Sequence, residues 1–119
     1  MENDPKIFDP KELLENLMDD KELVQTILEG FLMDIPEQIK TLEDYLEKKD
    51  IEGVERQAHT IKGACGNVGA AALQAIAYEM EKAGNAGDFE AVQKGMPELS
   101  SGFEILKQLI EATVEQWQS

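Results

Sequence analysis

The chain has little cysteine, histidine or positive charge, and each shortage argues against a kind of bond, site or partner. A single cysteine, Cys65, cannot form an internal disulfide, which is compatible with a reducing compartment. The single histidine, His59, and Cys65 together fall short of the usual number of metal ligands. With 11 basic and 25 acidic residues, the net charge of −14 argues against nucleic acids and anionic membrane surfaces as partners.

Long apolar runs are also absent. No stretch approaches the roughly 18 apolar residues that span a membrane, so we expect no membrane insertion. Residues 1–10 are acidic and lack the basic and apolar regions of a signal peptide, which predicts a cytoplasmic location. The chain of 119 residues shows neither a linker nor a repeat, and we predict a single domain over residues 1–119.

Strand patterns are missing, whereas helical periodicity runs through most of the chain. Apolar residues recur every three or four positions in four long segments that begin near residues 21, 51, 70 and 89, and a short segment from about residue 10 precedes them. The apolar stripe of the first long segment is Val24, Ile27, Phe31, Ile35, Ile39, Leu42 and Leu46. We predict an all-α fold, an antiparallel four-helix bundle with a short additional N-terminal helix.

Capping residues and helix breakers mark the ends of these segments. N-caps are expected at Asp9, Asp50 and Asp88. Clusters of glycine and asparagine at 66–69 and 84–87 predict helix ends followed by turns. Two segments contain an internal proline, Pro36 or Pro97, but their apolar stripes continue in phase, so we predict bends rather than breaks.

The segment around His59 combines features that are unusual on a helix surface. The inward stripe there centres on Ile61 and Cys65, and a spacing of 100° per residue turns His59 toward solvent. The same side of the helix carries three further residues, which follow His59 by three, four and seven positions: Lys62, Gly63 and Gly66. Glycine costs a helix interior about 1 kcal/mol relative to alanine, so two glycines beside an exposed histidine indicate that another protein surface comes close to the imidazole.

The charge pattern favours a phosphoryl group at His59. No acid lies between Arg56 and Tyr78. A phosphorylated histidine carries dianionic charge, and an acid-free surface would lower the repulsion that this charge meets. Lys62 lies one turn away, where it could donate to the phosphoryl oxygens.

A carboxylate on the following helix could orient the histidine. If the two helices form an antiparallel hairpin that turns near residues 69 and 70, His59 is level with Glu81, give or take one turn, and Glu79 is the competing candidate. A carboxylate at that place would accept the Nδ1 proton and leave Nε2 as the nucleophile.

Residues 58–63 (Ala-His-Thr-Ile-Lys-Gly), followed by Ala-Cys-Gly at 64–66 and Val-Gly-Ala at 68–70, resemble the signature of the histidine-containing phosphotransfer (Hpt) domains of two-component phosphorelays. The resemblance implies a helical bundle over most of the chain, with His59 as the phosphoacceptor at Nε2. It implies that Lys62 steadies the phosphoryl group and that Glu81 hydrogen-bonds the histidine. It also implies that room for the partner is left by Gly63 and Gly66.

The resemblance further implies a phosphoryl carrier rather than an enzyme, since the chain has no nucleotide-binding loop and is not expected to phosphorylate itself. The expected partners are a response-regulator receiver domain and a histidine kinase or hybrid kinase. The receiver would bring Mg²⁺ and the aspartate, whereas this chain, expected to be a monomer, would bind no cofactor. An exposed apolar surface for the partner is expected near His59, with Leu32 and Ile35 as candidates.

An alternative function from a different class is a non-catalytic helical bundle that binds a signalling partner without histidine chemistry. The intact set of His59, Lys62 and Gly63 favours phosphoryl transfer, because a module without that chemistry would tend to lose the histidine first.

Overall fold

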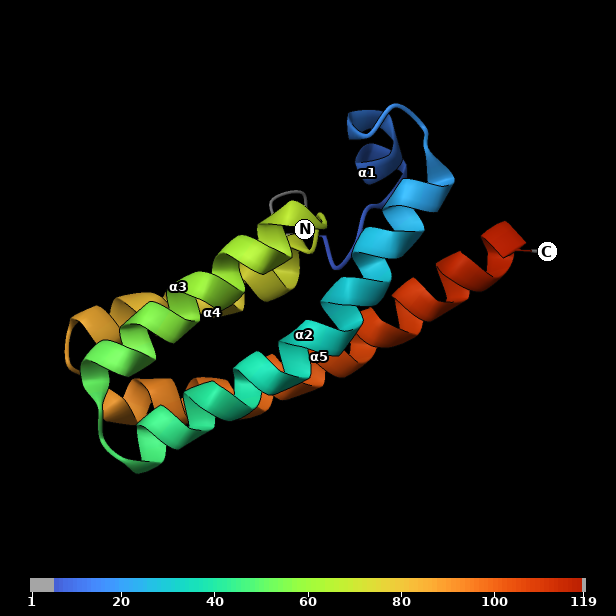
Figure 1. Cartoon of the computed structure of the whole chain (residues 1–119). Helices are drawn as coiled ribbons and strands as arrows, with labels where there is room; N and C mark the ends of the chain where they lie inside the picture. The colour runs from blue at the N-terminus through green and yellow to red at the C-terminus, as the bar shows by residue number, and fades with distance from the viewer. Residues whose placement is uncertain (1–5, 119) are drawn as a thin grey trace.

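The computed structural model describes residues 6–118, which contain five helices and no strand (Figure 1). The helices are α1 (Pro10–Asn16), α2 (Lys21–Glu47), α3 (Ile51–Asn67), α4 (Ala71–Asn85) and α5 (Phe89–Gln118). The predicted all-α class is confirmed. In Figure 1, α3 and α4 lie side by side as a hairpin against one half of the longer pair α2 and α5, which is consistent with the predicted four-helix bundle.

The short helix α1 lies near the end of the bundle where α2 begins and where α3 turns into α4 (Figure 1). Its buried residue Leu13 joins the common core. The segment before it is tied to α4, because the backbone N–H of Ala72 donates to the carbonyl of Lys6 at 2.8 Å. The expected short N-terminal helix is therefore present, and the segment before it is hydrogen-bonded to the start of α4, at the turn of the α3–α4 hairpin.

Aspartates begin four of the five helices. The carboxylates of Asp9, Asp20, Asp50 and Asp88 each accept a hydrogen bond from the backbone N–H three residues later, at 3.0 to 3.1 Å. Such caps satisfy one of the backbone donors that a helix start leaves unpaired. The three caps expected from the sequence are confirmed, and Asp20 adds a fourth.

Two glycines close the helices of the hairpin. Gly69 and Gly87 have φ values of 73° and 72°, in the left-handed region that glycine adopts without steric cost. After α3, the N–H of Ala70 donates to the carbonyl of Cys65 at 3.0 Å, a bond that is typical of a helix closed by a left-handed residue. Helix α4 consequently begins at Ala71.

The buried face of α2 differs from the predicted stripe at one position. Leu28 is fully buried, whereas Ile27 is only partly buried. Either residue continues a spacing of three or four between Val24 and Phe31, so periodicity alone does not distinguish them. Ile35 has an exposed fraction of 0%, and the expectation that it lies on an exposed apolar surface near His59 is wrong.

The two longest helices run through their prolines without a break. Pro36 lies inside α2 and Pro97 inside α5, and both helices continue beyond them, as the unshifted stripes predicted. Figure 1 shows that α2 changes direction along its length. None of the helices among residues 6–118 is both long enough and apolar enough to cross a membrane.

A glycine in the first turn of α3 permits close packing of α2 on α3. A Cβ atom added at Gly53 would lie 2.6 Å from Cε1 of Tyr45, so that the ring would have to move. We expect Gly53→Ala to lower the free energy of unfolding by about 1 kcal/mol in urea denaturation, because overpacking outweighs the better helix propensity of alanine.

The matched control is Gly30→Ala in α2, where an added Cβ would meet no atom within 4 Å. This variant is expected to raise the free energy of unfolding by about 0.5–1 kcal/mol. Equal stabilisation by both substitutions would show that Tyr45 moves aside without cost.

Candidate functional site

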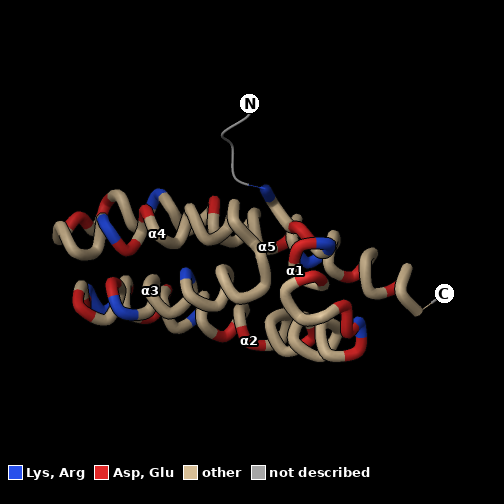
Figure 2. The backbone as a smooth tube through the Cα atoms, turned by 90° about the horizontal axis from the view of Figure 1, so that it is seen from above, with Lys and Arg blue, Asp and Glu red and all other residues tan. Residues whose placement is uncertain are grey.

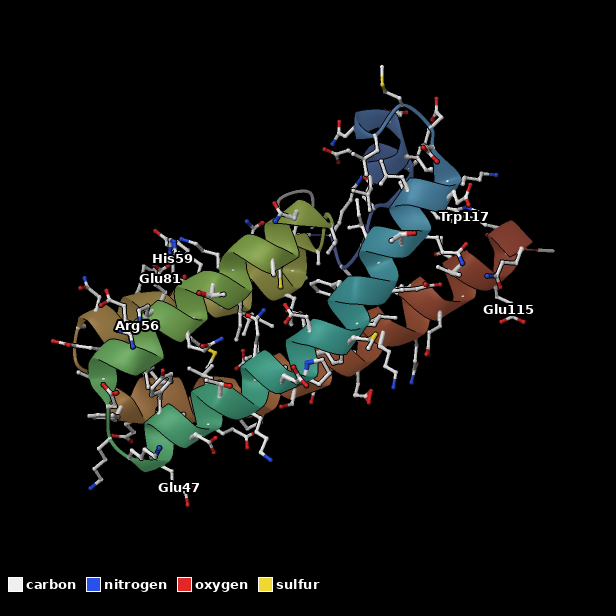
Figure 3. The ribbon with its side chains drawn as sticks, in the orientation of Figure 1. Glu47, Arg56, His59, Glu81, Glu115 and Trp117 are labelled. Atoms are coloured by element: carbon white, nitrogen blue, oxygen red, sulfur yellow. The ribbon has the colours of Figure 1, made fainter. Side chains whose placement is uncertain are left out.

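The α3–α4 hairpin brings His59 and Glu81 together. Both side chains project on the side of the hairpin that faces away from α2 and α5 (Figure 3). His59 Nδ1 lies 2.7 Å from Oε2 of Glu81. The competing candidate, Glu79, instead pairs with Lys82 at 3.1 Å. The register predicted from equal distances to the turn at Gly69 is therefore the register of the structure.

The contact with Glu81 selects the tautomer of His59. An ionised carboxylate can only accept hydrogen bonds, so Nδ1 carries the proton and donates it. In the neutral ring, the lone pair then lies on Nε2. The side chain of His59 is 65% exposed. The arrangement places this lone pair on an exposed ring.

The same carboxylate also holds Lys62. Its Nζ lies 2.7 Å from Oε1 of Glu81, so the two oxygens of Glu81 serve two different partners. Oε1 is buried and has no partner with hydrogen-bond geometry among the described residues, so the contact with Lys62 is an ion pair. Lys62 lowers the pKa of Glu81 below its usual value, burial opposes this effect, and the hydrogen bond from His59 adds to it.

Acidification is expected to remove the stabilisation that Glu81 contributes. Because the pKa of Glu81 is lowered by folding, its contribution is complete above the ordinary glutamate pKa of about 4.3 and is lost as the pH falls through the lower folded-state pKa. We expect wild type to exceed Glu81→Gln in free energy of unfolding at pH 7. The difference should shrink between about pH 5 and pH 3 in urea denaturation. A constant difference over that range would contradict the ion pair.

The two glycines beside His59 differ in their surroundings. A Cβ atom at Gly63 would meet no atom of the described residues within 4 Å, so this glycine opens the surface one turn after the histidine. A Cβ atom at Gly66 would lie 2.7 Å from Nε2 of Gln74, so the side chain of Gln74 already covers this position. The surface is therefore more open at Gly63 than at Gly66, and the role of both glycines in the approach of a partner stays a prediction.

Carboxylates lie closer to His59 than the acid-free sequence window indicates. A hollow of about 410 Å³ beside the histidine is lined by Glu52, Glu55, Arg56, His59 and Glu81. Figure 2 shows acidic and basic segments together on α3 and α4 toward the end of the hairpin away from its turn. The expected acid-free surface is wrong on this side, because the helix places Glu55 one turn before the histidine. Arg56 also lies one turn before it and offsets part of the negative charge.

Cys65 takes no part in this exposed site. It is fully buried in the core, and burial raises the pKa of its thiol to about 12. This agrees with its predicted place on the inward stripe. Within residues 6–118, no group of three or more histidine, cysteine, aspartate or glutamate side chains is placed to hold a metal ion.

The sequence pattern does not single out Tyr78, which the structure places beside Lys62. The Nζ atoms of Lys62 and Lys82 lie 5.2 and 4.8 Å from the centroid of its ring. The spacing along α4 could have indicated it, because Tyr78 precedes Glu81 and Lys82 by three and four residues and so shares their face of the helix.

Comparisons with known proteins agree with these features. A family model described as the Hpt domain matches residues 26–117. Among solved structures, the fold is similar to that of histidine-containing phosphotransfer protein B (HptB) from Pseudomonas aeruginosa PAO1, with a TM-score of 0.85 and 22% identity over 92% of this chain and 96% of that chain. No curated protein matches the sequence significantly. Because the family model covers most of the chain, including the hairpin that carries His59, the protein belongs to the histidine-containing phosphotransfer domains of two-component phosphorelays.

Proposed function

We propose that the protein carries a phosphoryl group on Nε2 of His59 and exchanges it with an aspartate of a response-regulator receiver domain. The observation that carries this proposal is the exposed imidazole of His59, whose Nδ1 is bonded to Glu81 and whose Nε2 has no hydrogen-bond partner among residues 6–118. Membership of the Hpt family supports the same chemistry. A histidine kinase or hybrid kinase is the alternative donor.

The transfer exchanges one bond for another. The Nε2 lone pair attacks the phosphorus of the aspartyl phosphate, the N–P bond forms, and the P–O bond to the aspartate breaks so that its carboxylate leaves. Nδ1 keeps its proton and its hydrogen bond to Glu81, and this carboxylate offsets the positive charge that the ring acquires during attack. In the reverse direction, the same bond orients phosphohistidine toward a receiver.

The remaining site residues act by position and charge. Lys62, one turn from His59, would donate to the phosphoryl oxygens. Gly63 would let the receiver backbone approach the imidazole. Mg²⁺ bound by the receiver would neutralise charge on the transferring group. The chain itself would then supply a positioned nucleophile and a docking surface.

Label transfer from a phosphorylated receiver tests the proposal. The purified full chain is mixed with several ³²P-phosphorylated receiver domains and Mg²⁺, and the label on the chain is followed after treatment with acid or base. We expect label that is lost in acid and kept in base, as for phosphohistidine, and no label from ATP alone. Acid-stable label, or no label from any receiver, would overturn the proposal and favour a non-catalytic interaction module.

A further inference from the structure

We propose that Tyr78 is a positioning residue for phosphoryl transfer, because its ring holds the ammonium group of Lys62 beside His59. This inference rests on the proposed function, since it assigns Tyr78 a role through Lys62 in the same reaction. Within residues 6–118, the ring contacts of Tyr78 are with Lys62 and Lys82 and not with His59, so its effect on the histidine would be indirect.

The ring and a carboxylate confine Lys62 together. Nζ of Lys62 lies 5.2 Å from the centroid of the Tyr78 ring and 2.7 Å from Oε1 of Glu81. The Lys62 side chain is only 26% exposed, unusually little for a surface lysine. A lysine side chain otherwise samples many rotamers, so two contacts on its ammonium group reduce the freedom that must be lost when it meets a phosphoryl group.

An aromatic ring suits this task because it attracts a cation without neutralising it. The negative face of the ring binds an ammonium group through its quadrupole. A second carboxylate at position 78 would hold Lys62 as well, but it would compete with the phosphoryl oxygens and repel them. Tyr78 therefore adds a second contact that fixes Lys62 without adding another negative charge beside the carboxylate of Glu81.

Lys82 contacts the same ring and provides an internal comparison. Its Nζ lies 4.8 Å from the ring centroid and 3.1 Å from Oε1 of Glu79. Its side chain is 51% exposed, about twice the exposed fraction of Lys62, and its carboxylate partner is Glu79 rather than Glu81. If Tyr78 acts through Lys62, removing Lys82 leaves the effect of Tyr78 on transfer intact.

Nuclear magnetic resonance tests the contact without any transfer reaction. In wild type, we expect the ring current of Tyr78 to shift the Lys62 ε-methylene protons upfield. The shift is expected to persist in Tyr78→Phe and to disappear in Tyr78→Leu. Loss of the shift in the phenylalanine variant, or its persistence in the leucine variant, would overturn the contact whether or not His59 carries a phosphoryl group.

Transfer kinetics test the role. From a phosphorylated receiver, Tyr78→Leu should slow transfer roughly threefold to tenfold, the size of one partly exposed cation–π contact, whereas Tyr78→Phe should match wild type. In a Lys62→Ala background the leucine substitution should have no further effect, and in a Lys82→Ala background it should keep its full effect. Circular dichroism of each variant checks that the helices are intact.

The outcomes separate this inference from the proposed function. If wild type accepts the label and Tyr78→Leu transfers equally fast, only the role of Tyr78 is overturned. If Tyr78→Leu slows transfer to the same extent with and without Lys62, Tyr78 contacts the partner directly and the positioning role is overturned. If wild type accepts no label from any receiver, the proposed function itself fails.

Discussion

His59→Gln is expected to reduce label transfer from a phosphorylated receiver to background. A glutamine amide can still donate a hydrogen bond to Glu81, but it offers no nucleophilic nitrogen to phosphorus. Because the His59 side chain is 65% exposed, the free energy of unfolding should change by no more than about 0.5 kcal/mol. Receiver binding, measured by isothermal titration calorimetry, should stay within about threefold of wild type, since most of the docking surface is unchanged.

Thr60→Ala is the matched control for this prediction. Thr60 is the next residue on α3, it is exposed, and its hydroxyl donates to the backbone carbonyl of Arg56 within the helix. This variant should accept label at the wild-type rate. Residual label on His59→Gln with the acid lability of a phosphoramidate would mean that the phosphoacceptor lies elsewhere.

Gly63→Gln is expected to separate stability from function. No atom lies within 4 Å of an added Cβ, so the folded chain has room for a side chain, and the free energy of unfolding should rise by up to about 1 kcal/mol because glycine is replaced inside a helix. A receiver that approaches His59 would meet the new side chain. We expect the second-order rate constant for transfer to fall on the order of tenfold or more, measured from single-turnover kinetics at several receiver concentrations.

Gly30→Ala controls for the change in helix stability alone. Gly30 lies in α2, and an added Cβ there would also meet no atom within 4 Å, so this variant should stabilise the chain without any effect on transfer. An unchanged second-order rate constant in Gly63→Gln would show that the partner does not approach over this position. The two variants together distinguish an effect of increased stability of the chain from steric exclusion of the receiver.

Local signals in the sequence were sufficient to predict the helices and to place His59 opposite Glu81 to within about one turn. Aspartate caps, left-handed glycines and the 3.6-residue period each act over a few residues, so they can be recognised without the fold. The pairing of His59 with Glu81 needed only one long-range assumption, an antiparallel hairpin about Gly69. Because that turn is short, the predicted register was correct to within about one turn. Glu79 nevertheless remained a candidate until the structure showed that it pairs with Lys82 and that Glu81 pairs with His59.

The parts that could not be predicted depend on packing between helices. Periodicity allowed either Ile27 or Leu28 in the core, and only the neighbouring helices decide between them. Ile35 is a different case, because it belongs to the apolar stripe of α2 and periodicity alone already placed it in the core. The contact between Tyr78 on α4 and Lys62 on α3 depends on side chains that meet only across the hairpin. Spacing along one helix does not report such contacts.

The burial of Cys65 gives the protein a natural reporter of its own opening. It is the only thiol in the chain and lies on the same helix as His59, two residues before the end of α3. Because the folded protein hides the sulfur and keeps it protonated, a thiol-modifying dye can react only during moments when α3 separates from its neighbours. The labelling rate therefore measures how often the helix that carries His59 detaches, with no engineered probe, and it can be compared directly with and without the proposed phosphoryl group.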